Sequence, residues 1–338
     1  MQRKSIDLNG ITLSYLDHGE GPALLLCHGF PETSYAWRHQ IPALAAAGYR
    51  VLAPDLRGYG ESTAPQAIDE YTVFDAVGDL IGLLDALSIE RSIVAGGDWG
   101  ATIAWQAALM RPDRVVGIVA LGVPMMGRAP IPPTRLFPRM DGELHYTLYF
   151  QDPGAAEREL ERDVRLSLRR ILHAASGDAG LRHPGDGTPN PFGMVAPSAG
   201  LLHALPDAPA LPAWLSESDL DHYAASFTRS GFRGGLNYYR NLDRNWRLQA
   251  SLAGTKVHVP ALFAVGSRDT GLAMPGMREI IADMPRLVTN LRGSVKIEGA
   301  GHWLQQERPD AINDLMLSFA DSLSGGEMSH QRRKVGAC

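Results

Sequence analysis

Four apolar runs of strand length lie between residues 22 and 121, and none of them alternates apolar with polar side chains. They occupy residues 22–27, 50–53, 91–96 and 114–121. A strand buried on both faces needs such a continuous run, and strands of this kind are typical of parallel sheets covered by helices on both sides. The runs therefore predict an α/β fold with a mostly parallel central sheet.

Helical stretches separate these strands, and the clearest of them spans residues 72–87. Its apolar side chains recur at helical spacing, while aspartates take the other positions and should form the polar side of the helix. The apolar positions are Val73, Val77, Leu80, Leu84 and Leu87, and the aspartates are Asp75, Asp79 and Asp85.

Both ends of the folded region carry further elements of the sheet. Residues 3–9 and 11–17, joined at Asn9-Gly10, predict an antiparallel hairpin at the sheet edge. The strand pattern resumes late in the chain, before a helix whose apolar side would pack on the sheet. These later elements are strands at 260–265 and 294–298 and a helix at about 307–322 with Ile312, Leu315, Met316 and Phe319 on its apolar side.

The composition changes after Pro124, which divides the chain. Residues 125–235 hold Pro- and Gly-rich stretches with Arg- and Glu-bearing helical segments between them, and we expect an inserted, mainly helical cap. The core would then consist of residues 1–124 and 236–323. Residues 324–338 have no apolar period and predict a flexible polar tail.

Charge and cysteine content exclude several classes of function. The 32 basic and 37 acidic residues, a formal net charge of −5, provide no basic face for nucleic acid. Two cysteines, Cys27 and Cys338, build neither a disulfide framework nor a cysteine metal site. The N-terminus lacks an apolar signal core, and no run reaches the roughly 18 to 20 apolar residues of a membrane span. We expect a cytoplasmic protein, either a monomer or a homodimer.

The segment Gly96-Gly97-Asp98-Trp99-Gly100-Ala101 connects a predicted strand to a predicted helix with the spacing of a nucleophile elbow. Such a turn strains its central residue, and the small residues around it let strand and helix approach. The central residue is Asp98 instead of Ser. A carboxylate displaces a leaving group at saturated carbon and forms an alkyl ester, which suits epoxides or alkyl halides.

The same stretch nearly matches a dinucleotide-binding fingerprint, with Ala95, Gly97 and Gly100 at its three positions. That motif should follow the first strand of its unit and precede an acid by about 20 residues. The region at 119–123 holds no acid, so this alternative is disfavoured.

Three further segments fit an active site around Asp98. His302 follows the last strand and Asp269 the strand before it, so the order 98, 269, 302 matches nucleophile, acid and base of an α/β-hydrolase. Asp269 would orient the imidazole without taking its proton. The backbone N–H groups of Phe30 and Trp99 would bind an oxyanion, and His28 would hydrogen-bond its own loop.

Together these segments resemble the epoxide hydrolases of the α/β-hydrolase superfamily, similar to the hydrolase domain of soluble epoxide hydrolase, over about residues 5–322. The family normally has His before its nucleophile, where this chain has Gly97, which puts the support of the elbow in question but leaves the nucleophile intact. The motifs are HGFPETSYAW (28–37), DLRGYGES (55–62), GGDWGA (96–101), YTLYFQDPGAAEREL (146–160), SGFRGGLNYYRN (230–241), SRD (267–269) and GAGHWLQQERP (299–309).

The resemblance implies that two cap tyrosines, Tyr146 and Tyr239, donate hydrogen bonds to the epoxide oxygen. A phenol stays protonated at neutral pH and can donate as alkoxide charge builds. Tyr149 remains an alternative to Tyr146, and we interpret Tyr238 as packing.

Large apolar residues near these motifs should line a pocket for a small apolar epoxide. For Trp37, core filling is an equal alternative. Asp55 and Arg57 should fix a loop. The expected pocket residues are Phe30, Pro31, Trp37, Trp99 and Trp303.

The resemblance implies hydrolysis of epoxides to vicinal diols through an ester on Asp98, which water activated by the His302–Asp269 pair then hydrolyses. No cofactor and no metal is expected. One alternative is a haloalkane or haloacid dehalogenase with the same nucleophile, which would need halide-stabilising donors. Another is a non-catalytic small-molecule binding protein, since a fold alone does not establish activity.

Overall fold

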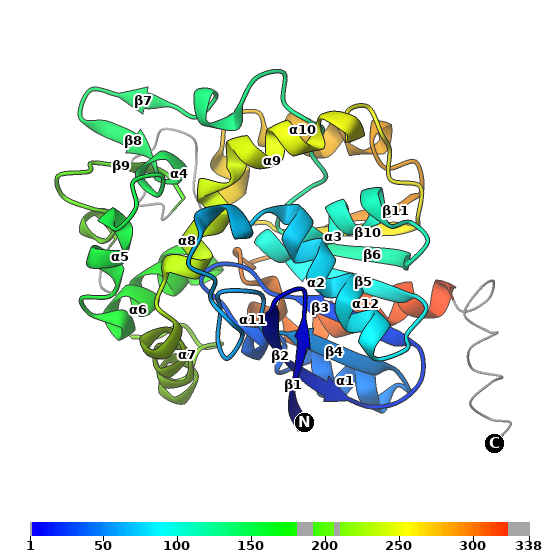
Figure 1. Cartoon of the computed structure of the whole chain (residues 1–338). Helices are drawn as coiled ribbons and strands as arrows, with labels where there is room; N and C mark the ends of the chain where they lie inside the picture. Colours follow the sequence, from blue (N-terminus) through cyan, green and yellow to red (C-terminus); the bar gives the residue numbers. More distant parts are fainter. Residues whose placement is uncertain (1, 181–191, 206–209, 324–338) are drawn as a thin grey trace, which may run out of the picture.

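An eight-stranded sheet forms the centre of the molecule (Figure 1), a computed structural model that describes residues 2–180, 192–205 and 210–323. The predicted tail at 324–338 lies outside the described residues. The strand order is β1-β2-β4-β3-β5-β6-β10-β11. The strands are β1 (Gln2–Leu8), β2 (Ile11–His18), β3 (Ala23–Cys27), β4 (Arg50–Pro54), β5 (Ser92–Gly97), β6 (Val115–Leu121), β10 (Ala261–Gly266) and β11 (Leu291–Ile297).

The expected parallel sheet and edge hairpin are both confirmed. Strands β3 to β6, β10 and β11 pair in parallel, and β2 is antiparallel to both of its neighbours. The hairpin turns at Asn9 and Gly10, with φ angles of 50° and 78°. Because that turn needs two positive φ angles, an Asn-Gly pair suits it. Strand β3 and its parallel neighbour β5 are buried along their whole length, as the continuous apolar runs required.

Helices cover both faces of the sheet. Helices α2 (Val73–Ala86) and α3 (Trp99–Met110) pack on one face, and α1 (Gln40–Ala46) and α12 (Pro309–Leu323) pack on the other. The apolar side predicted for α12 is confirmed, since Ile312 and Met316 are fully buried. Apolar side chains removed from water on both faces supply the main driving force for this layered arrangement.

The expectation that Asp79 belongs to the polar side of its helix is wrong. Asp79 is buried and forms a two-bond ion pair with Arg57, at 2.7 Å from Nε to Oδ2 and 2.7 Å from Nη2 to Oδ1. Arg57 belongs to the loop after β4, and a buried charge is tolerated when a partner of opposite charge meets it. The carboxylate of Asp55 accepts the backbone N–H groups of Ser34 and Glu61. Asp55 and Arg57 therefore both fix this loop, as expected.

The region expected to form a cap gathers on one side of the sheet (green in Figure 1). It contains a small antiparallel sheet that was not predicted, because strands of two or three residues are too short to show a period. The elements are β7 (Arg139–Met140), β8 (Glu143–His145), α4 (Tyr146–Tyr149), α5 (Ala155–Leu160), α6 (Val164–Ala175), β9 (Met194–Val195), α7 (Glu217–Ser230) and α8 (Arg233–Arg240).

The boundary expected at residue 235 falls inside α8, whose hydrogen bonds continue as far as that from Asn241 N–H to Asn237 O, at 3.2 Å. The chain then returns to the core. Its remaining helices are α9 (Leu242–Leu248), α10 (Met277–Asp283) and α11 (Leu304–Glu307).

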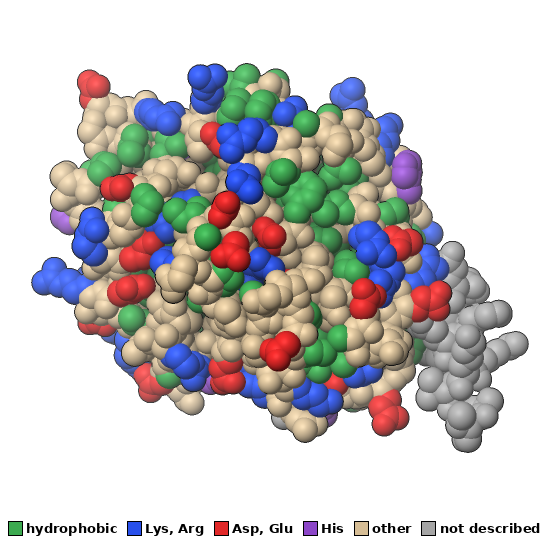
Figure 2. Space-filling model, in the orientation of Figure 1, with side chains coloured by type: hydrophobic (Ala, Val, Ile, Leu, Met, Phe, Trp, Pro, Cys, Tyr) green, Lys and Arg blue, Asp and Glu red, His purple; other side chains and the backbone are tan. Residues whose placement is uncertain are grey.

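The surface seen in Figure 2 carries basic and acidic side chains interspersed over the same face. Such mixing agrees with the small net charge of −5. Among residues 2–323, apart from the gaps at 181–191 and 206–209, no helix is long and apolar enough to span a bilayer.

Candidate active site

Asp98 lies at a strained turn between β5 and α3, with φ 52° and ψ −122°. Non-glycine residues rarely adopt a positive φ, and such strain is most often kept at functional sites. Neighbouring glycines make the turn possible: a Cβ at Gly96 would lie 2.2 Å from the Gly100 carbonyl, and one at Gly100 would lie 2.0 Å from Cys27 O. The small residues predicted to allow close approach of strand and helix are thus required.

The loop after β3 brings a backbone donor to the Asp98 carboxylate. Phe30 N–H donates to Asp98 Oδ1 at 2.8 Å. Gly29 permits this approach, since a Cβ there would lie 2.3 Å from the Asp98 Cβ. Trp99 is the first residue of α3, where backbone N–H groups have no partner within the helix. The two N–H groups expected to bind an oxyanion therefore come from segments that meet at Asp98.

His28 serves its own loop, as expected. The Leu56 N–H donates to His28 Nε2 at 3.0 Å, so Nδ1 carries the proton and faces Gly29 O at 2.9 Å. Burial lowers the pKa of His28, which keeps the imidazole neutral.

The structure brings together the three side chains predicted to form a triad. His302 Nδ1 lies 3.1 Å from Asp269 Oδ2, and His302 Nε2 lies 3.2 Å from Asp98 Oδ2. Asp269 is buried, and the Gly271 N–H donates to its Oδ1 at 2.7 Å. Asp98 follows β5, Asp269 follows β10 and His302 follows β11. The carboxyl ends of parallel strands are where the sites of open α/β sheets lie.

The imidazole of His302 has a carboxylate on each side. Burial opposes its charged form, but Asp269 and Asp98 outweigh burial and raise its pKa well above the ordinary value. The raised pKa of His302 favours the charged imidazole beside the two carboxylates, whereas a general base must be neutral. Loss of the Asp98 charge removes one of the two groups that keep it protonated.

Tyr146 and Tyr239 meet beside this group. Their ring centroids are 5.7 Å apart, and the Tyr239 ring lies 5.2 Å from that of Trp99. The Tyr239 hydroxyl is buried and has no hydrogen-bond partner among the described residues. Burial and the charge of Asp98 raise the pKa of both phenols, so both remain donors. A buried donor without a partner is costly unless a ligand meets it.

Tyr149, the alternative to Tyr146, is occupied elsewhere. Its hydroxyl donates to Glu159 Oε2 at 2.7 Å. Tyr238 donates to Arg57 O at 3.2 Å and packs against Trp99, as expected of a packing residue. Of the tyrosines considered, the structure thus brings Tyr146 and Tyr239 into one cluster beside the elbow.

Comparison with known proteins identifies the family. Residues 22–309 match the family model described as alpha/beta hydrolase fold. The chain is 46% identical over 325 residues to "Epoxide hydrolase A" of Mycobacterium tuberculosis, covering 94% of this chain and 97% of that protein. The chain belongs to the epoxide hydrolases of the alpha/beta hydrolase fold family.

Other members of this epoxide hydrolase family agree with the resemblance seen in the motifs. "Epoxide hydrolase 1" of Siraitia grosvenorii is 40% identical, covering 94% of this chain and 98% of that protein. A solved structure, "Epoxide hydrolase from an endophytic Streptomyces", superposes with a TM-score of 0.91 at 41% identity, covering 96% of each chain.

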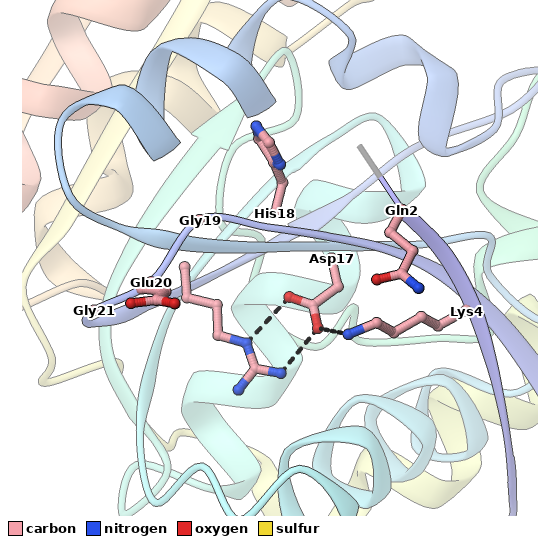
Figure 3. Close-up of a pocket in the computed structure, with 8 residues that line it drawn as sticks. Gln2, Lys4, Asp17, His18, Gly19, Glu20 and Gly21 are labelled. Atoms are coloured by element: carbon pink, nitrogen blue, oxygen red, sulfur yellow. Dashed lines mark hydrogen bonds and ion pairs between the residues drawn. The ribbon is translucent and has the colours of Figure 1, made fainter.

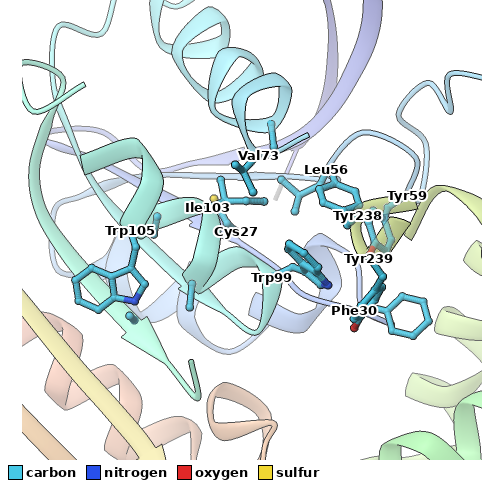
Figure 4. Packing of buried hydrophobic residues seen from close by; sticks show 14 of the residues in the cluster. Cys27, Phe30, Leu56, Tyr59, Val73, Trp99, Ile103, Trp105, Tyr238 and Tyr239 are labelled. Carbon is cyan, nitrogen blue, oxygen red and sulfur yellow. The ribbon is translucent and has the colours of Figure 1, made fainter. Parts of the chain in front are cut away.

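Some of the residues expected to line the pocket of this epoxide hydrolase lie near Asp98. Phe30, Trp99 and Tyr239 lie beside one another (Figure 4), and Pro31 is buried next to Phe30. Trp37 is not a pocket wall: it is fully buried in the cluster on the α1 and α12 face, so the core-filling alternative is correct. The aromatic spacing along residues 28–37 could not reveal on which face of the sheet Trp37 packs.

Two neighbours of His302 complete the aromatic surroundings. The Trp303 ring lies 4.9 Å from the imidazole of His302. Its Nε1–H donates to Leu172 O at 2.8 Å, so Trp303 packs against His302 as a fixed neighbour. Phe192, which was not predicted, lies 5.0 Å from the His302 ring and 5.4 Å from Tyr146. Its Pro- and Gly-rich surroundings give no periodic signal from which its position could be inferred.

Sequence reasoning also missed Glu32, which joins two loops of the site. Its carboxylate accepts the Gly29 N–H and the side-chain amides of Gln305 and Gln306. Burial raises its pKa to about 7. An acid inside the HGFPE motif was the signal that could have indicated it.

Gly97, where the family usually has His, leaves the elbow intact. The atoms nearest to a Cβ at this position belong to Gln305, with Oε1 at 3.5 Å, so a side chain would have room. The Gln305 Oε1 atom is buried without a partner among the described residues. Gly97 therefore does not disturb the turn that holds Asp98, and a buried acceptor without a partner lies beside it.

A separate surface hollow lies at the hairpin edge of the sheet (Figure 3). Asp17 neutralises its two nearest cations, at 2.8 Å from Lys4 and 2.9 Å from Arg50. Arg50 begins β4, so this hollow lies at the amino end of that parallel strand, whereas Asp98 follows the carboxyl end of β5. Within the three described ranges, no cluster of three or more His, Cys, Asp or Glu residues has the arrangement of a metal site.

Proposed function

We propose that this chain hydrolyses epoxides to vicinal diols through an ester on Asp98. The supporting observation is a carboxylate at the strained elbow with the His302 imidazole 3.2 Å away. Serine at this position would serve acyl substrates, while a carboxylate is suited to displacement at saturated carbon. The named relatives act on epoxides according to their own descriptions, which favours the same substrate class here.

In the first step the two carboxylate oxygens of Asp98 have different roles. Oδ1 keeps the Phe30 N–H, while Oδ2 leaves its contact with His302 Nε2 and attacks the epoxide carbon, and the C–O bond of the ring breaks. The Tyr146 and Tyr239 hydroxyls donate to the leaving oxygen as its negative charge develops. One of the two phenols transfers its proton to that oxygen, so the products of this step are an alkyl ester, the first hydroxyl of the diol and a tyrosinate.

In the second step water attacks the ester carbonyl of Asp98. Ester formation removes the Asp98 charge, which lowers the pKa of His302, so the imidazolium gives its proton to the tyrosinate through solvent and the neutral imidazole can accept a proton from the attacking water. Asp269 holds Nδ1 and stabilises the imidazolium that forms. Phe30 N–H, with the Trp99 N–H, receives the oxyanion that develops on Oδ1. The acyl oxygen bond then breaks, and the leaving alkoxide takes the proton of the carboxylic acid that water attack has formed. This releases the diol and restores the Asp98 carboxylate beside protonated His302.

The test is incubation of the purified chain with styrene oxide and, separately, with a 1-haloalkane. Epoxide hydrolysis gives the diol, a dehalogenase releases halide, and a binding protein gives neither. Two phenols in one cluster favour an epoxide oxygen over a halide as the group to be stabilised. Halide release without diol would overturn the proposal.

We expect Tyr239→Phe and Tyr146→Phe each to slow alkylation by about 10²-fold, since each removes one donor to the leaving oxygen. Tyr149→Phe is the matched control, because its hydroxyl faces Glu159, and its rate should stay within about 3-fold. Rapid-quench measurement of ester formation distinguishes these rates. A larger loss in Tyr149→Phe than in Tyr146→Phe would reverse the two assignments.

Cytoplasmic location, assembly as a monomer or homodimer, and the division into core and cap stay predictions from the sequence. Size-exclusion chromatography with light scattering tests the assembly.

A further inference from the structure

The segment that carries His302 is held by a carboxylate that the reaction scheme above does not use. The Gly301 N–H donates to Glu307 Oε2 at 2.8 Å, and the Trp303 N–H donates to Glu307 Oε1 at 3.0 Å. Both chain neighbours of His302 are therefore bound by one side chain. We call residues 299–303 the base loop.

The same carboxylate also holds the end of a cap helix. Glu307 Oε2 accepts the N–H of Gly177, which follows α6, at 2.9 Å. The His302 N–H donates to Ala175 O at 2.9 Å, at the end of that helix. Three consecutive N–H groups of the base loop thus depend on Glu307 or on the end of α6.

The backbones of cap and base loop are in direct contact at this point. A Cβ at Gly177 would lie 2.2 Å from Gly299 O, and one at Gly301 would lie 2.3 Å from Gly177 N. Arg268, beside Asp269 in the chain, donates to Gly177 O at 3.0 Å. Movement of this cap segment is therefore transmitted to the backbone on both sides of His302 without an intervening side chain.

Glu307 is chemically suited to this position and difficult to replace. Its side chain is 6% exposed, and three backbone N–H groups oppose the rise in its pKa that burial causes. A glutamine has the same shape, but its NH₂ group would face an N–H donor in either orientation. At least one of the three N–H groups would lose its acceptor.

We propose that Glu307 is a positioning residue for the hydrolytic half of the reaction, which keeps His302 aligned by joining the base loop to the Ala175–Gly177 segment of the cap. The inference rests on the proposed function. Alkylation needs Asp98 and the tyrosines, whereas ester hydrolysis needs His302 aimed at water. Misalignment of His302 should therefore slow the second step selectively.

The experiment compares wild type, Glu307→Gln, Glu307→Asp and Glu159→Gln with styrene oxide by rapid quench and intact-protein mass. Glu159 is the matched control, since it also accepts two backbone N–H groups, those of Leu201 and Leu202, but lies in the cap away from His302. Melting temperatures report any general loss of stability in each variant.

In Glu307→Gln we expect ester hydrolysis to slow by about 10- to 100-fold and alkylation to change by less than about 3-fold, so that ester accumulates. The pH dependence of ester hydrolysis should also shift in Glu307→Gln, because the His302 imidazole no longer keeps its position beside Asp269. Glu307→Asp, which retains a charge but is shorter, should lie between wild type and Gln. Glu159→Gln should leave the ratio of the two rates unchanged.

Equal slowing of both steps in Glu307→Gln, or a lower melting temperature with an unchanged ratio, would overturn the positioning role. Failure of both Glu307 variants to fold would also count against it, since it would assign the carboxylate to the fold as a whole. Absence of ester and diol in the wild type would instead refute the proposed function, so the two failures are distinguishable.

Discussion

An Asp98→Ala variant should form no ester and lose about 10⁵-fold or more of its turnover of styrene oxide, because no other side chain replaces the nucleophile. Removal of the nucleophile from an enzyme with a catalytic triad has an effect of this size. Diol formation and intact-protein mass after incubation with substrate measure both quantities. Turnover near the wild-type rate would remove Asp98 from its proposed role.

Asp98→Asn is the matched control for shape. The amide can still accept the Phe30 N–H and fits the same turn, so a loss of turnover in both variants reflects chemistry instead of local structure. The positive φ of 52° at Asp98 allows a second check of the turn. Glycine adopts such a φ without strain, so Asp98→Gly should have a higher melting temperature than Asp98→Ala.

A His302→Gln variant should still be alkylated but should hydrolyse its ester at least about 10³-fold more slowly, within the range for loss of general base catalysis. Its mass after incubation should rise by that of one substrate molecule. The reason is that Oδ2 of Asp98 attacks directly, whereas the proton of the attacking water has no acceptor once the imidazole is absent.

The double variant Asp98→Ala, His302→Gln serves as the control for nonspecific alkylation and should show no mass gain. A verified substrate that leaves His302→Gln unmodified while the wild type makes diol would argue against two-step chemistry.

Continuous apolar runs predicted the central sheet well because burial on both faces leaves a strong signal. Polarity was a poorer guide where a distant partner decides the environment. Asp79 is buried only because Arg57, 22 residues earlier, reaches it, and periodicity contains no information about such a pair. The two- and three-residue strands of the small sheet are likewise set by tertiary contacts.

For the site, chain order and position after strands indicated which residues meet. Asp98 and Asp269 each lie within hydrogen-bond distance of His302, as their spacing suggested. The direction in which individual side chains point could not be predicted from the sequence. The sequence places Trp99 beside the nucleophile, but nothing in it indicates that Trp37 packs on the far face of the sheet or that Tyr149 faces Glu159.

The contact between Gly177 and the base loop has a consequence for altering substrate scope. If the segment at 175–177 came from a relative, its own backbone would meet residues 299–301, and neither Gly177 nor Gly301 has space for even one added methyl group. Chimaeras should exchange residues 175–177 and 299–307 as a single unit. Libraries aimed at new epoxides are better confined to other cap positions, so that changes in fit leave hydrolysis of the ester intact.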